Sequence, residues 1–517
     1  MTQSLGRTAL LLVWTLCVTG CGEDDGPTVT ACGEGQVDDG GTCVPEVCGT
    51  GTWGELVTDG DTLFVDAQVS ADGDGSKDAP FQTLEKALSE AESSGRLHVA
   101  VAAGTYHETL YLEEELSGLE LTGRCAELVV LDGSTSDIDD VATVEVAGSF
   151  SHKYTLSGLT LQGGEFAAFS VVSGVAIVES CRLVESEWNG AYAGGPSARL
   201  TLTDVEIADI QGSWDGKYGY GVYLHDGATL EATGLQVSGA IEFGVVSYDC
   251  SVELERVEIR DTVPRDGTGA GYGLYVLDSE LTATDLTLSG NSEASLMILG
   301  SDAVIEQLQI GPTLVGNEGR ARGLVVAEDS TLTLKDGSIL DSGDFGLLAD
   351  ASSLTLEQVL VQGLVGDGDS IGAGITLNEA WLDAQACRVE DAVRTGINLV
   401  ASEATLDGVW IGGTEPLSVD SCAAIQAYES TLQGLDCTIE DNRGVGLLAY
   451  GADVTLSGFT IEDTWSLESG SGGYGIQALG SVLQVSSSTI SGSHGLGLGL
   501  QSSLVTLDEV EVLDTHR

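Results

Sequence analysis

Aromatic side chains gather in one short stretch of a chain that is otherwise poor in them. Only 5% of the 517 residues are aromatic, yet six aromatic residues fall within 36 positions, with four polar residues among or beside them. The ten residues are Trp188, Tyr192, Trp214, Asp215, Lys217, Tyr218, Tyr220, Tyr223, His225 and Asp226. Exposed rings can stack on sugar rings while polar groups bind the hydroxyls. The cluster is therefore a candidate carbohydrate-binding site; the alternative is an aromatic ladder that only stabilises one flank of the fold.

Acidic residues on glycine-rich segments are the next candidates for chemistry. Asp72, Asp74 and Asp78, and separately Asp367 and Asp369, offer oxygen atoms at short spacing, and oxygen is the ligand that Ca²⁺ prefers. Neither group matches the twelve-residue calcium loop with its closing Glu or the repeated Gly-Gly-x-Gly-x-Asp frame. We expect no cofactor and no dedicated metal site, with diffuse Ca²⁺ binding to acidic loops at most.

The N-terminal cysteines form a group of their own. Cys32, Cys43 and Cys48 lie in a Gly-rich stretch with little hydrophobic content, which resembles a small disulfide-knotted stalk, and Cys125 is a candidate fourth member. No histidine accompanies them, and their spacings fit no zinc pattern. We therefore expect disulfides here, which an exported chain can form.

The charge balance excludes two classes of partner. The chain has 81 Asp and Glu against 19 Lys and Arg, a formal net charge of −62. A nucleic-acid binder needs basic groups to replace the counterions of phosphates, and docking of such a body on anionic lipid is disfavoured. Hydrophobic residues nevertheless make up 42% of the chain, so it can bury a core, unlike a disordered acidic tail.

A repeat organises the body of the chain. A Gly, Ala or Ser followed by an apolar residue recurs, and gaps of 22–23 and 28–31 residues alternate through 13 intervals. The repeat starts are Ala167, Gly190, Gly221, Gly244, Gly273, Ser295, Gly323, Gly346, Gly374, Gly396, Ala424, Gly446, Gly475 and Gly497. Such regular self-similarity is the signature of a solenoid.

Within each unit the apolar residues alternate with polar ones, which predicts short half-buried strands. Val454 and Leu456 flank Thr455, for example. Three such strands per unit, stacked on the next unit, predict an all-β fold: a right-handed parallel β-helix with turns about 4.8 Å apart. A leucine-rich repeat is excluded because its frame is absent.

The stacking predicts where particular side chains lie. Tyr192, Tyr223 and Tyr275 share the outward position two residues after the repeat start. Cys387 and Cys437 share an inward position two turns apart, about 9.6 Å, which is too far for a disulfide. Because the inward columns are apolar, acids are expected to crowd the turns and to stack on acids of successive turns.

The longer gaps place extra residues after the third strand of every second turn. These loops would project from the same edge of the solenoid, which is often its working face; the alternative is duplication in pairs, with loops that merely tolerate length. The loops cover residues 208–219, 261–271, 311–322, 362–373, 412–422 and 463–474.

The segment before the repeat resembles the N-terminal region of pectin-lyase-like β-helix proteins. A Gly/Asp loop (residues 72–78), Pro80-Phe81, a helical pattern to Ala91 and Gly104-Thr105-Tyr106 follow one another as in those proteins. The resemblance covers roughly residues 61–517. It implies a capping helix ahead of the coil, and it is weak for activity, because the superfamily includes lyases, hydrolases, epimerases and adhesins.

No catalytic residue can be assigned by this resemblance. Hydrolases of the polygalacturonase type use clustered aspartates, Gly-His-Gly and Arg-Ile-Lys, whereas this chain has Ser493-His494-Gly495, no Arg-Ile-Lys, and its Asp139-Asp140 pair before the repeat. Lyases need an Arg or Lys base, and the basic residues here are scattered. Paired carboxylates are not informative in a chain with 81 of them.

The first residues are typical of an export signal. Arg7 precedes an apolar run from Ala9 to Val18, which is too short to span a bilayer. Val18-Thr19-Gly20-Cys21 resembles the lipobox of bacterial lipoproteins, which implies lipidation of Cys21; ordinary secretion is the alternative. Gly22 in place of an aspartate favours the outer membrane or cell surface.

Together these observations predict a lipid-anchored surface protein. Its parts are a signal peptide (1–20), a lipidated tether and Cys-rich stalk (21–60), a cap with the first turns (61–166) and regular β-helix repeats (167–517). We expect a non-catalytic role in binding, adhesion or envelope structure, with carbohydrate the best candidate ligand, a membrane contact through the lipid only, and no nucleic acid. The alternative is a polysaccharide-active lyase, hydrolase or epimerase on the same scaffold.

Overall fold

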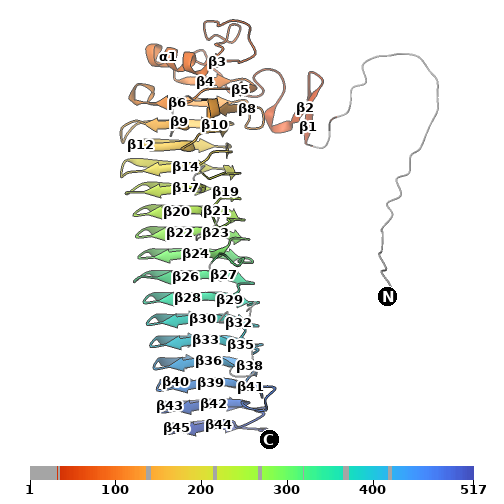
Figure 1. Ribbon diagram of the computed structural model, residues 1–517, viewed down its shortest axis with the longest axis vertical. Coiled ribbons are helices and arrows are strands. Elements are labelled where there is room, and N and C mark those ends of the chain that lie inside the picture. Colours follow the sequence, from red (N-terminus) through yellow and green to blue (C-terminus); the bar gives the residue numbers. More distant parts are fainter. Residues whose placement is uncertain are drawn as a thin grey trace, which may run out of the picture.

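The chain folds into a parallel β-solenoid of about 16 turns. The computed structural model describes residues 32, 35–135, 141–212, 218–265, 271–317, 319–364, 372–416 and 422–516. Stacked turns build a long rod, with the helix α1 (Leu84–Ser94) at one end and the C-terminal strands at the other (Figure 1). The all-β class and the stacked parallel strands predicted from the repeat are confirmed.

One strand from each turn joins the sheet that we call the front sheet. Its strands are β6 (Leu110–Leu112), β9 (Ala142–Ala147), the first part of β12 (Ala167–Glu179), β14 (Asn189–Gly194), β17 (Tyr220–His225), β20 (Phe243–Tyr248), β22 (Tyr272–Leu277), β24 (Glu293–Leu299), β26 (Ala321–Ala327), β28 (Phe345–Asp350), β30 (Ala373–Asn378), β33 (Thr395–Val400), β36 (Ala423–Tyr428), β39 (Val445–Tyr450), β42 (Tyr474–Leu479) and β44 (Leu498–Gln501).

The remaining strands of the rod form the back sheet. They are β3 (Leu63–Val65), β4 (His98–Val101), β5 (Gly104–Tyr106), β7 (Glu120–Gly123), β8 (Val129–Asp132), β10 (Lys153–Ser157), β11 (Thr160–Gln162), the rest of β12, β13 (Arg182–Val184), β15 (Ala198–Thr203), β16 (Glu206–Ala208), β18 (Thr229–Thr233), β19 (Gln236–Ser238), β21 (Ser251–Arg260), β23 (Glu280–Ser289), β25 (Asp302–Ile310), β27 (Thr331–Leu340), β29 (Ser353–Gln362), β31 (Trp381–Gln385), β32 (Arg388–Glu390), β34 (Glu403–Asp407), β35 (Trp410–Gly412), β37 (Thr431–Leu435), β38 (Thr438–Arg443), β40 (Asp453–Ser457), β41 (Thr460–Trp465), β43 (Val482–Ile490) and β45 (Leu504–Val512).

Two expected strands per turn often run together in the back sheet. In β23, for example, Asp285 takes a left-handed conformation with φ 56° and bends the strand without breaking its pairing to β21 and β25. Asp tolerates this conformation better than most residues. Turns such as β21, β23 and β25 therefore have one bent strand where the sequence predicts two.

The register agrees with the repeat except at its first unit. Ala191 pairs with Val222, which pairs with Val245, as the starts Gly190, Gly221 and Gly244 require. In the first unit, however, Ala167 pairs with Asn189, so Ala168 and not Ala167 is equivalent to Gly190. The inward side chains form one continuous apolar core from Leu63 to Ile490.

The recurring glycine is required by close approach of the turns. A Cβ on Gly346 would lie 2.8 Å from the carbonyl oxygen of Gly374 in the next turn and would also collide with Val361. Contacts under about 3.0 Å to a backbone oxygen cannot relax without moving the stacked turn. The glycine therefore lets successive front strands meet at strand spacing.

A ladder of serines holds the corner between the front and back sheets. The N–H of Ser279 donates to Oγ of Ser301 at 2.9 Å, and the N–H of Ser301 donates to Oγ of Ser330 at 3.1 Å. Each hydroxyl in turn donates to a nearby carbonyl, as Ser279 does to Leu277. The serine hydroxyls thus form hydrogen bonds with corner N–H and C=O groups that have no partner in a strand.

A second corner places acids against glycines. The carboxylates of Asp261, Asp341, Asp391 and Asp463 each lie against the Cα of a glycine in the next turn, namely Gly290, Gly363, Gly413 and Gly492. The glycine leaves the space that each carboxylate occupies, so these four acids do not stack on an acid of the next turn. The register nevertheless places Asp441 and Asp463 at this corner in successive turns, about 4.8 Å apart, within the Debye length of about 8 Å at physiological salt. The expectation that acids stack on acids therefore holds for that pair and fails where a glycine follows.

The N-terminal cap is built around a short helix. Oγ1 of Thr83 accepts the N–H of Lys86 and caps α1, while Gly95 ends it in a left-handed conformation. The helix begins at Leu84, later than the predicted start at Pro80, because Phe81 pairs with Phe64 as an extended segment instead. Leu84, Ala87 and other helix residues cover the open end of the core.

A small module packs against the side of the rod. It contains β1 (Gln36–Asp39), β2 (Thr42–Pro45) and the 3-10 helix η1 (Glu46–Cys48); two further 3-10 turns, η2 (Glu114–Leu116) and η3 (Gly133–Thr135), belong to the cap. Disulfides join Cys32 to Cys43 within the module and Cys48 to Cys125 on the rod. Buried Arg124 of the rod donates to the Cys48 carbonyl and to Asp39 at 2.7 Å.

Other cysteines of the rod are buried free thiols. Cys387 and Cys437 lie at the same inward corner position, one turn on either side of Val409, and both are 1% exposed. Their two-turn separation follows from the register that the sequence predicts.

We predict that Gly346→Ala destabilises the rod by about 1–3 kcal/mol, because the added methyl overpacks the contact between turns. Urea unfolding followed by circular dichroism measures the change. Gly60→Ala is the matched control, since Gly60 has open space around its Cα. Equal stability of the two variants would contradict the close-approach explanation.

Candidate functional site

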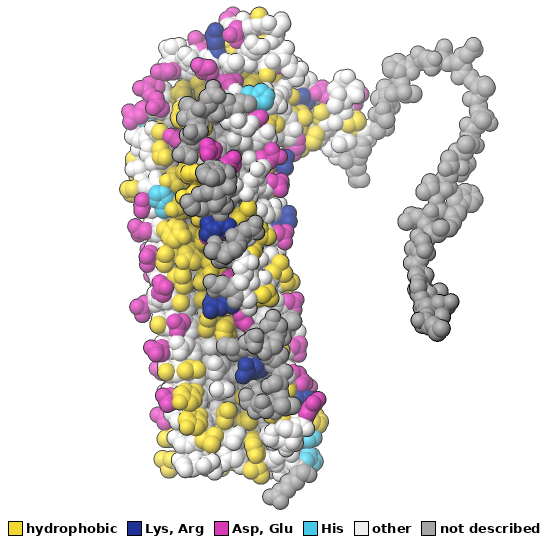
Figure 2. All heavy atoms as spheres, in the orientation of Figure 1, with side chains coloured by type: hydrophobic (Ala, Val, Ile, Leu, Met, Phe, Trp, Pro, Cys, Tyr) yellow, Lys and Arg dark blue, Asp and Glu magenta, His cyan; other side chains and the backbone are white. Residues whose placement is uncertain are grey.

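The outer face of the front sheet differs from the rest of this acidic rod. Its central outward column has no acidic residue from β14 to β42: Tyr192, Tyr223, Val246, Tyr275, Met297, Val325, Leu348, Thr376, Asn398, Gln426, Leu448 and Gln477. Hydrophobic side chains gather over this middle part of the rod, while acidic ones lie along its edges (Figure 2). We call this surface the front face.

Aromatic rings cover the N-terminal half of the front face. The prediction that Tyr192, Tyr223 and Tyr275 share one outward column is confirmed by the register. Val246, which lies between Tyr223 and Tyr275, is fully buried although it points outward. Rings from the flanking columns cover it. We call this group the aromatic patch: Tyr192, Tyr220, Tyr223, Phe243, Val246, Tyr248, Tyr272 and Tyr275.

The rings of the aromatic patch pack mostly edge to face. The ring centroids of Tyr192 and Tyr223 are 5.7 Å apart at 67°, and those of Tyr223 and Tyr248 are 6.0 Å apart at 88°. Tyr272 and Tyr275 stack at 19°. Such contacts stabilise the flank beyond simple burial. The aromatic ladder, which is the alternative interpretation of these residues, is therefore present, and its tyrosines remain only partly buried.

A hydrogen-bonded chain lies at one edge of the patch. Oη of Tyr192 is 2.6 Å from Nε2 of His225, and Nδ1 of His225 is 2.9 Å from the carboxylate of Asp226. With Nδ1–H donating to Asp226, Nε2 accepts a hydrogen bond from the Tyr192 hydroxyl. Burial, together with the Tyr223 and Asp226 charges, raises the pKa of Tyr192. The phenol thus stays protonated and is held in one orientation.

The other residues of the predicted site divide into two groups. Trp188 stacks on Tyr218 with centroids 4.7 Å apart, at the loop side of the front face, and Tyr218 contacts Tyr220. Trp214, Asp215 and Lys217 lie outside the described residues. The structure therefore brings seven of the ten predicted residues into or beside the aromatic patch.

Two ion pairs, one partly buried and one largely buried, line the loop side of the same face. Arg265 lies 3.3 Å from Glu242, and Arg322 lies 3.5 Å from Glu293. Burial raises the pKa of Glu242, and the nearby Arg265 opposes that shift. Because an unpaired charge is costly where solvent is largely excluded, each of these carboxylates is stabilised by its arginine.

A cleft of about 480 Å³ lies on the C-terminal half of the front face. Its floor includes Asn398, Gln426, Leu448 and Gln477 of the central column. The segment between β41 and β42 supplies one wall through Leu467, Ser471 and Gly472. Arg394, the residue immediately before β33, also lines the cleft. Its remaining lining residues are Thr395, Cys422, Ala423, Gly444, Val445 and Tyr474.

Two stacked tyrosines lie on the same strands as the cleft floor. Tyr428 and Tyr450 follow Gln426 and Leu448 by two residues, so they point to the same face. Their rings are 5.1 Å apart at 6° and are 39% and 51% exposed. The cleft was not predicted from the sequence, although the recurring amides Asn398, Gln426 and Gln477 of the outward column pointed to it.

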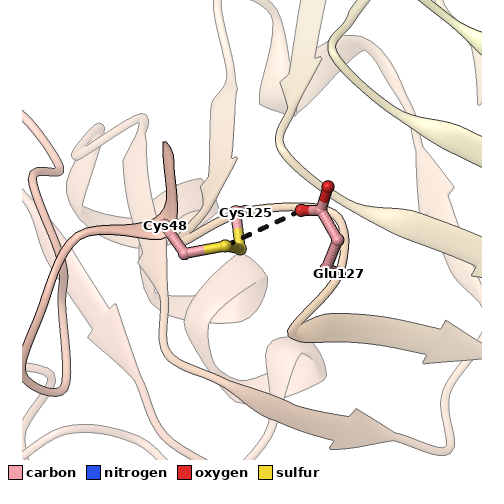
Figure 3. Close-up of side chains that lie close together, drawn as sticks. All are labelled: Cys48, Cys125 and Glu127. Atoms are coloured by element: carbon pink, nitrogen blue, oxygen red, sulfur yellow. Dashed lines mark hydrogen bonds between the residues drawn. A yellow bond between two sulfur atoms is a disulfide. The ribbon is translucent and has the colours of Figure 1, made fainter. Parts of the chain in front are cut away.

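The described acidic group before the helix is engaged by contacts within the protein. The carboxylate of Asp72 accepts the N–H of Gln82 and contacts Lys86, and Asp74 accepts the N–H of Ser76; Asp367 and Asp369 lie outside the described residues. Sγ of Cys48 is 3.7 Å from a Glu127 carboxylate oxygen. Cys48 and Cys125 are joined to each other, however (Figure 3), so their sulfurs are not thiolate ligands.

Comparison with known proteins gives the fold a context. No family model matches the chain. The uncharacterized protein YwoF of Bacillus subtilis (strain 168) is 31% identical over 159 residues, which span 30% of this chain and 30% of that protein. Among the described residues, no helix is long and apolar enough to cross a membrane.

Several solved structures show a distant likeness. The Dettilon tailspike protein has a TM-score of 0.30 at 10% identity, over 81% of this chain and 68% of that one. The lacto-N-biosidase of Eubacterium ramulus has 0.24 at 10%, over 88% and 68%. The mannuronan C-5 epimerase A-module of Azotobacter vinelandii has 0.23 at 13%, over 83% and 94%. We draw no conclusion about activity from likenesses of this size.

Alkaline pH is expected to weaken the aromatic patch. Burial raises the pKa of Tyr223 and Tyr275, and that of Tyr248 to about 12, whereas an unfolded tyrosine titrates near 10. The protonated tyrosines of the patch therefore contribute their full stabilisation of the folded state below about pH 10, and this contribution is lost as the pH rises toward 12. A pH titration followed by phenolate absorbance should show a group of tyrosines that ionise well above pH 10. Tyr248→Phe should reduce that group by one tyrosine. Titration of every tyrosine near pH 10 in the folded protein would contradict it.

Proposed function

We propose that this protein is an exported, lipid-anchored surface rod that binds glycans along its front face without cleaving them. The observation that carries the proposal is the acid-free column from Tyr192 to Gln477 in a chain of net charge −62. A coat of acids elsewhere keeps the flanks solvated and opposes self-association. The front face combines rings, amides and hydroxyls, the groups that bind sugars, in a column without acids.

An elongated face suits an elongated ligand. The aromatic patch and the cleft lie on one column, and Tyr275 and Asn398 are five turns apart, roughly 24 Å at the usual strand spacing. A polymer can contact both, and each contact strengthens the other through effective concentration. This geometry supports a polysaccharide over a single small molecule.

The proposed anchor is the lipidated Cys21, which lies outside the described residues. Two disulfides near the N-terminus support export, because disulfides persist mainly in oxidising compartments. The outer membrane or cell surface remains the proposed location, with the membrane contacted through the lipid only and no nucleic-acid partner.

The alternative function is a polysaccharide-active enzyme. One observation favours it: Tyr192, His225 and Asp226 form a chain through which a proton can move. Reducing-end and unsaturated-product assays on a polysaccharide panel test it. Cleavage that His225→Ala abolishes would overturn the binding-only proposal.

We predict that Tyr223→Ala/Tyr275→Ala weakens glycan binding at least tenfold, or about 1.4 kcal/mol. Affinity electrophoresis in gels containing neutral or acidic polysaccharides measures the change for the wild type and the variant. Trp381→Ala is the matched control, because Trp381 is 37% exposed on the back sheet. Equal loss in both variants, or no retardation of the wild type by any polysaccharide, would refute binding at the patch.

Replacing Cys21 tests the anchor separately. Cys21→Ala should abolish incorporation of labelled palmitate in a bacterial host and release the protein from the membrane fraction, because lipidation requires the thiol. Retention of label by the variant would place the lipid elsewhere, and absence of label in the wild type would refute the anchor.

A further inference from the structure

Among the described residues, Arg394 differs from its basic neighbours in having no acidic partner. Arg388 is paired with Glu390, and Arg443 is paired with Glu415 at 2.7 Å. Within the described part of the chain, the exposed guanidinium of Arg394 has neither an ion pair nor a hydrogen bond. Because acids outnumber bases 81 to 19 in this chain, an arginine beside a cleft without an acidic partner among the described residues is unexpected.

The backbone holds Arg394 at the rim of the cleft. Its N–H donates to the Glu415 carbonyl at 2.7 Å, and its φ is 77°. The nearby Glu415 carboxylate is already occupied by Arg443. No acidic residue is among the described residues that line the cleft. Among the described residues that line the cleft, Arg394 is the one charged group, and it lies in the negative field of an acidic rod.

The cleft floor offers hydrogen bonds of both senses. Asn398, Gln426 and Gln477 present amide groups, each with donors and an acceptor. A sugar ring presents hydroxyls in the same mixed pattern. The stacked rings of Tyr428 and Tyr450 continue the floor by two residues and can contact an adjoining sugar. The volume of about 480 Å³ falls in the range of ligand sites.

We propose that the cleft binds an anionic sugar unit, with its carboxylate or sulfate on Arg394 and its hydroxyls on the amide row. Arginine is suited to this role because its planar fork makes two parallel hydrogen bonds to such a group. The inference rests on the proposed glycan binding and adds what that proposal leaves open, namely the charge of the ligand. The negative charge of the rod repels an anionic ligand. Preference for an anionic over a neutral sugar therefore depends on the guanidinium of Arg394.

Titration calorimetry on the full chain with three probes tests the proposal. The probes are an oligogalacturonate, a chondroitin sulfate oligosaccharide and a neutral maltooligosaccharide, so carboxylate and sulfate are told apart. We expect at least one anionic probe to bind more tightly than the neutral one. Arg394→Gln should weaken that binding at least tenfold and leave the neutral probe unchanged.

Arg388→Gln is the matched control, because it makes the same charge change at an exposed arginine of the back sheet. It should leave all three affinities within about twofold. A second variant, Gln426→Ala, should weaken the anionic probe while its melting temperature stays that of the wild type.

The outcomes separate this inference from the proposed function. If polysaccharide binding persists but Arg394→Gln and Gln426→Ala have no effect on any probe, the cleft proposal is overturned and binding at the aromatic patch stands. Equal losses in Arg394→Gln and Arg388→Gln would also overturn it, since net charge alone would then explain the effect. If no glycan binds the wild type, both proposals fail.

Discussion

Every turn of this rod must superimpose on the next at the spacing of hydrogen-bonded strands. That constraint explains features that otherwise look unrelated. Gly346 lacks a side chain because the next turn's carbonyl is too close. Ser301 stands at a corner because a hydroxyl can replace a strand partner. Asp285 bends a strand because it tolerates a left-handed backbone. Stacking in register therefore dictates which residue types each position accepts.

The same stacking decides where charge can lie. Inward columns are apolar, and the corner at Asp391 alternates an acid with a glycine in the next turn, so acids concentrate on corners and flanks. The front face is the exception, since its central column lacks acids from β14 to β42. Tyrosines lie toward the N-terminal end of that column, aliphatic side chains follow, and amides near Arg394 lie toward its C-terminal end. A charged coat with one neutral face is the arrangement on which the proposed glycan binding depends.

Much of the fold and part of the site could be predicted, and the errors are informative. The register follows from glycine spacing, because alternation of side chains leaves little freedom once one residue per turn is placed; only the first unit, at Ala167, was displaced by one residue. Column membership of Tyr192 and Tyr275 follows from that register. The helix begins at Leu84 and not at the predicted Pro80, because Phe81 is extended and hydrogen-bonds to Phe64. Local periodicity does not reveal such a contact.

The stacked strands, the apolar core and the shared column of tyrosines can be predicted from the sequence, because they follow from a period that repeats along the chain. Which cations are neutralised and where a cleft opens depend on contacts between turns. Arg388 and Arg394 look alike in sequence, yet one lies against Glu390 and the other stands at the cleft rim. That difference depends on loop geometry and on partners from other turns, and no spacing along the chain encodes either directly.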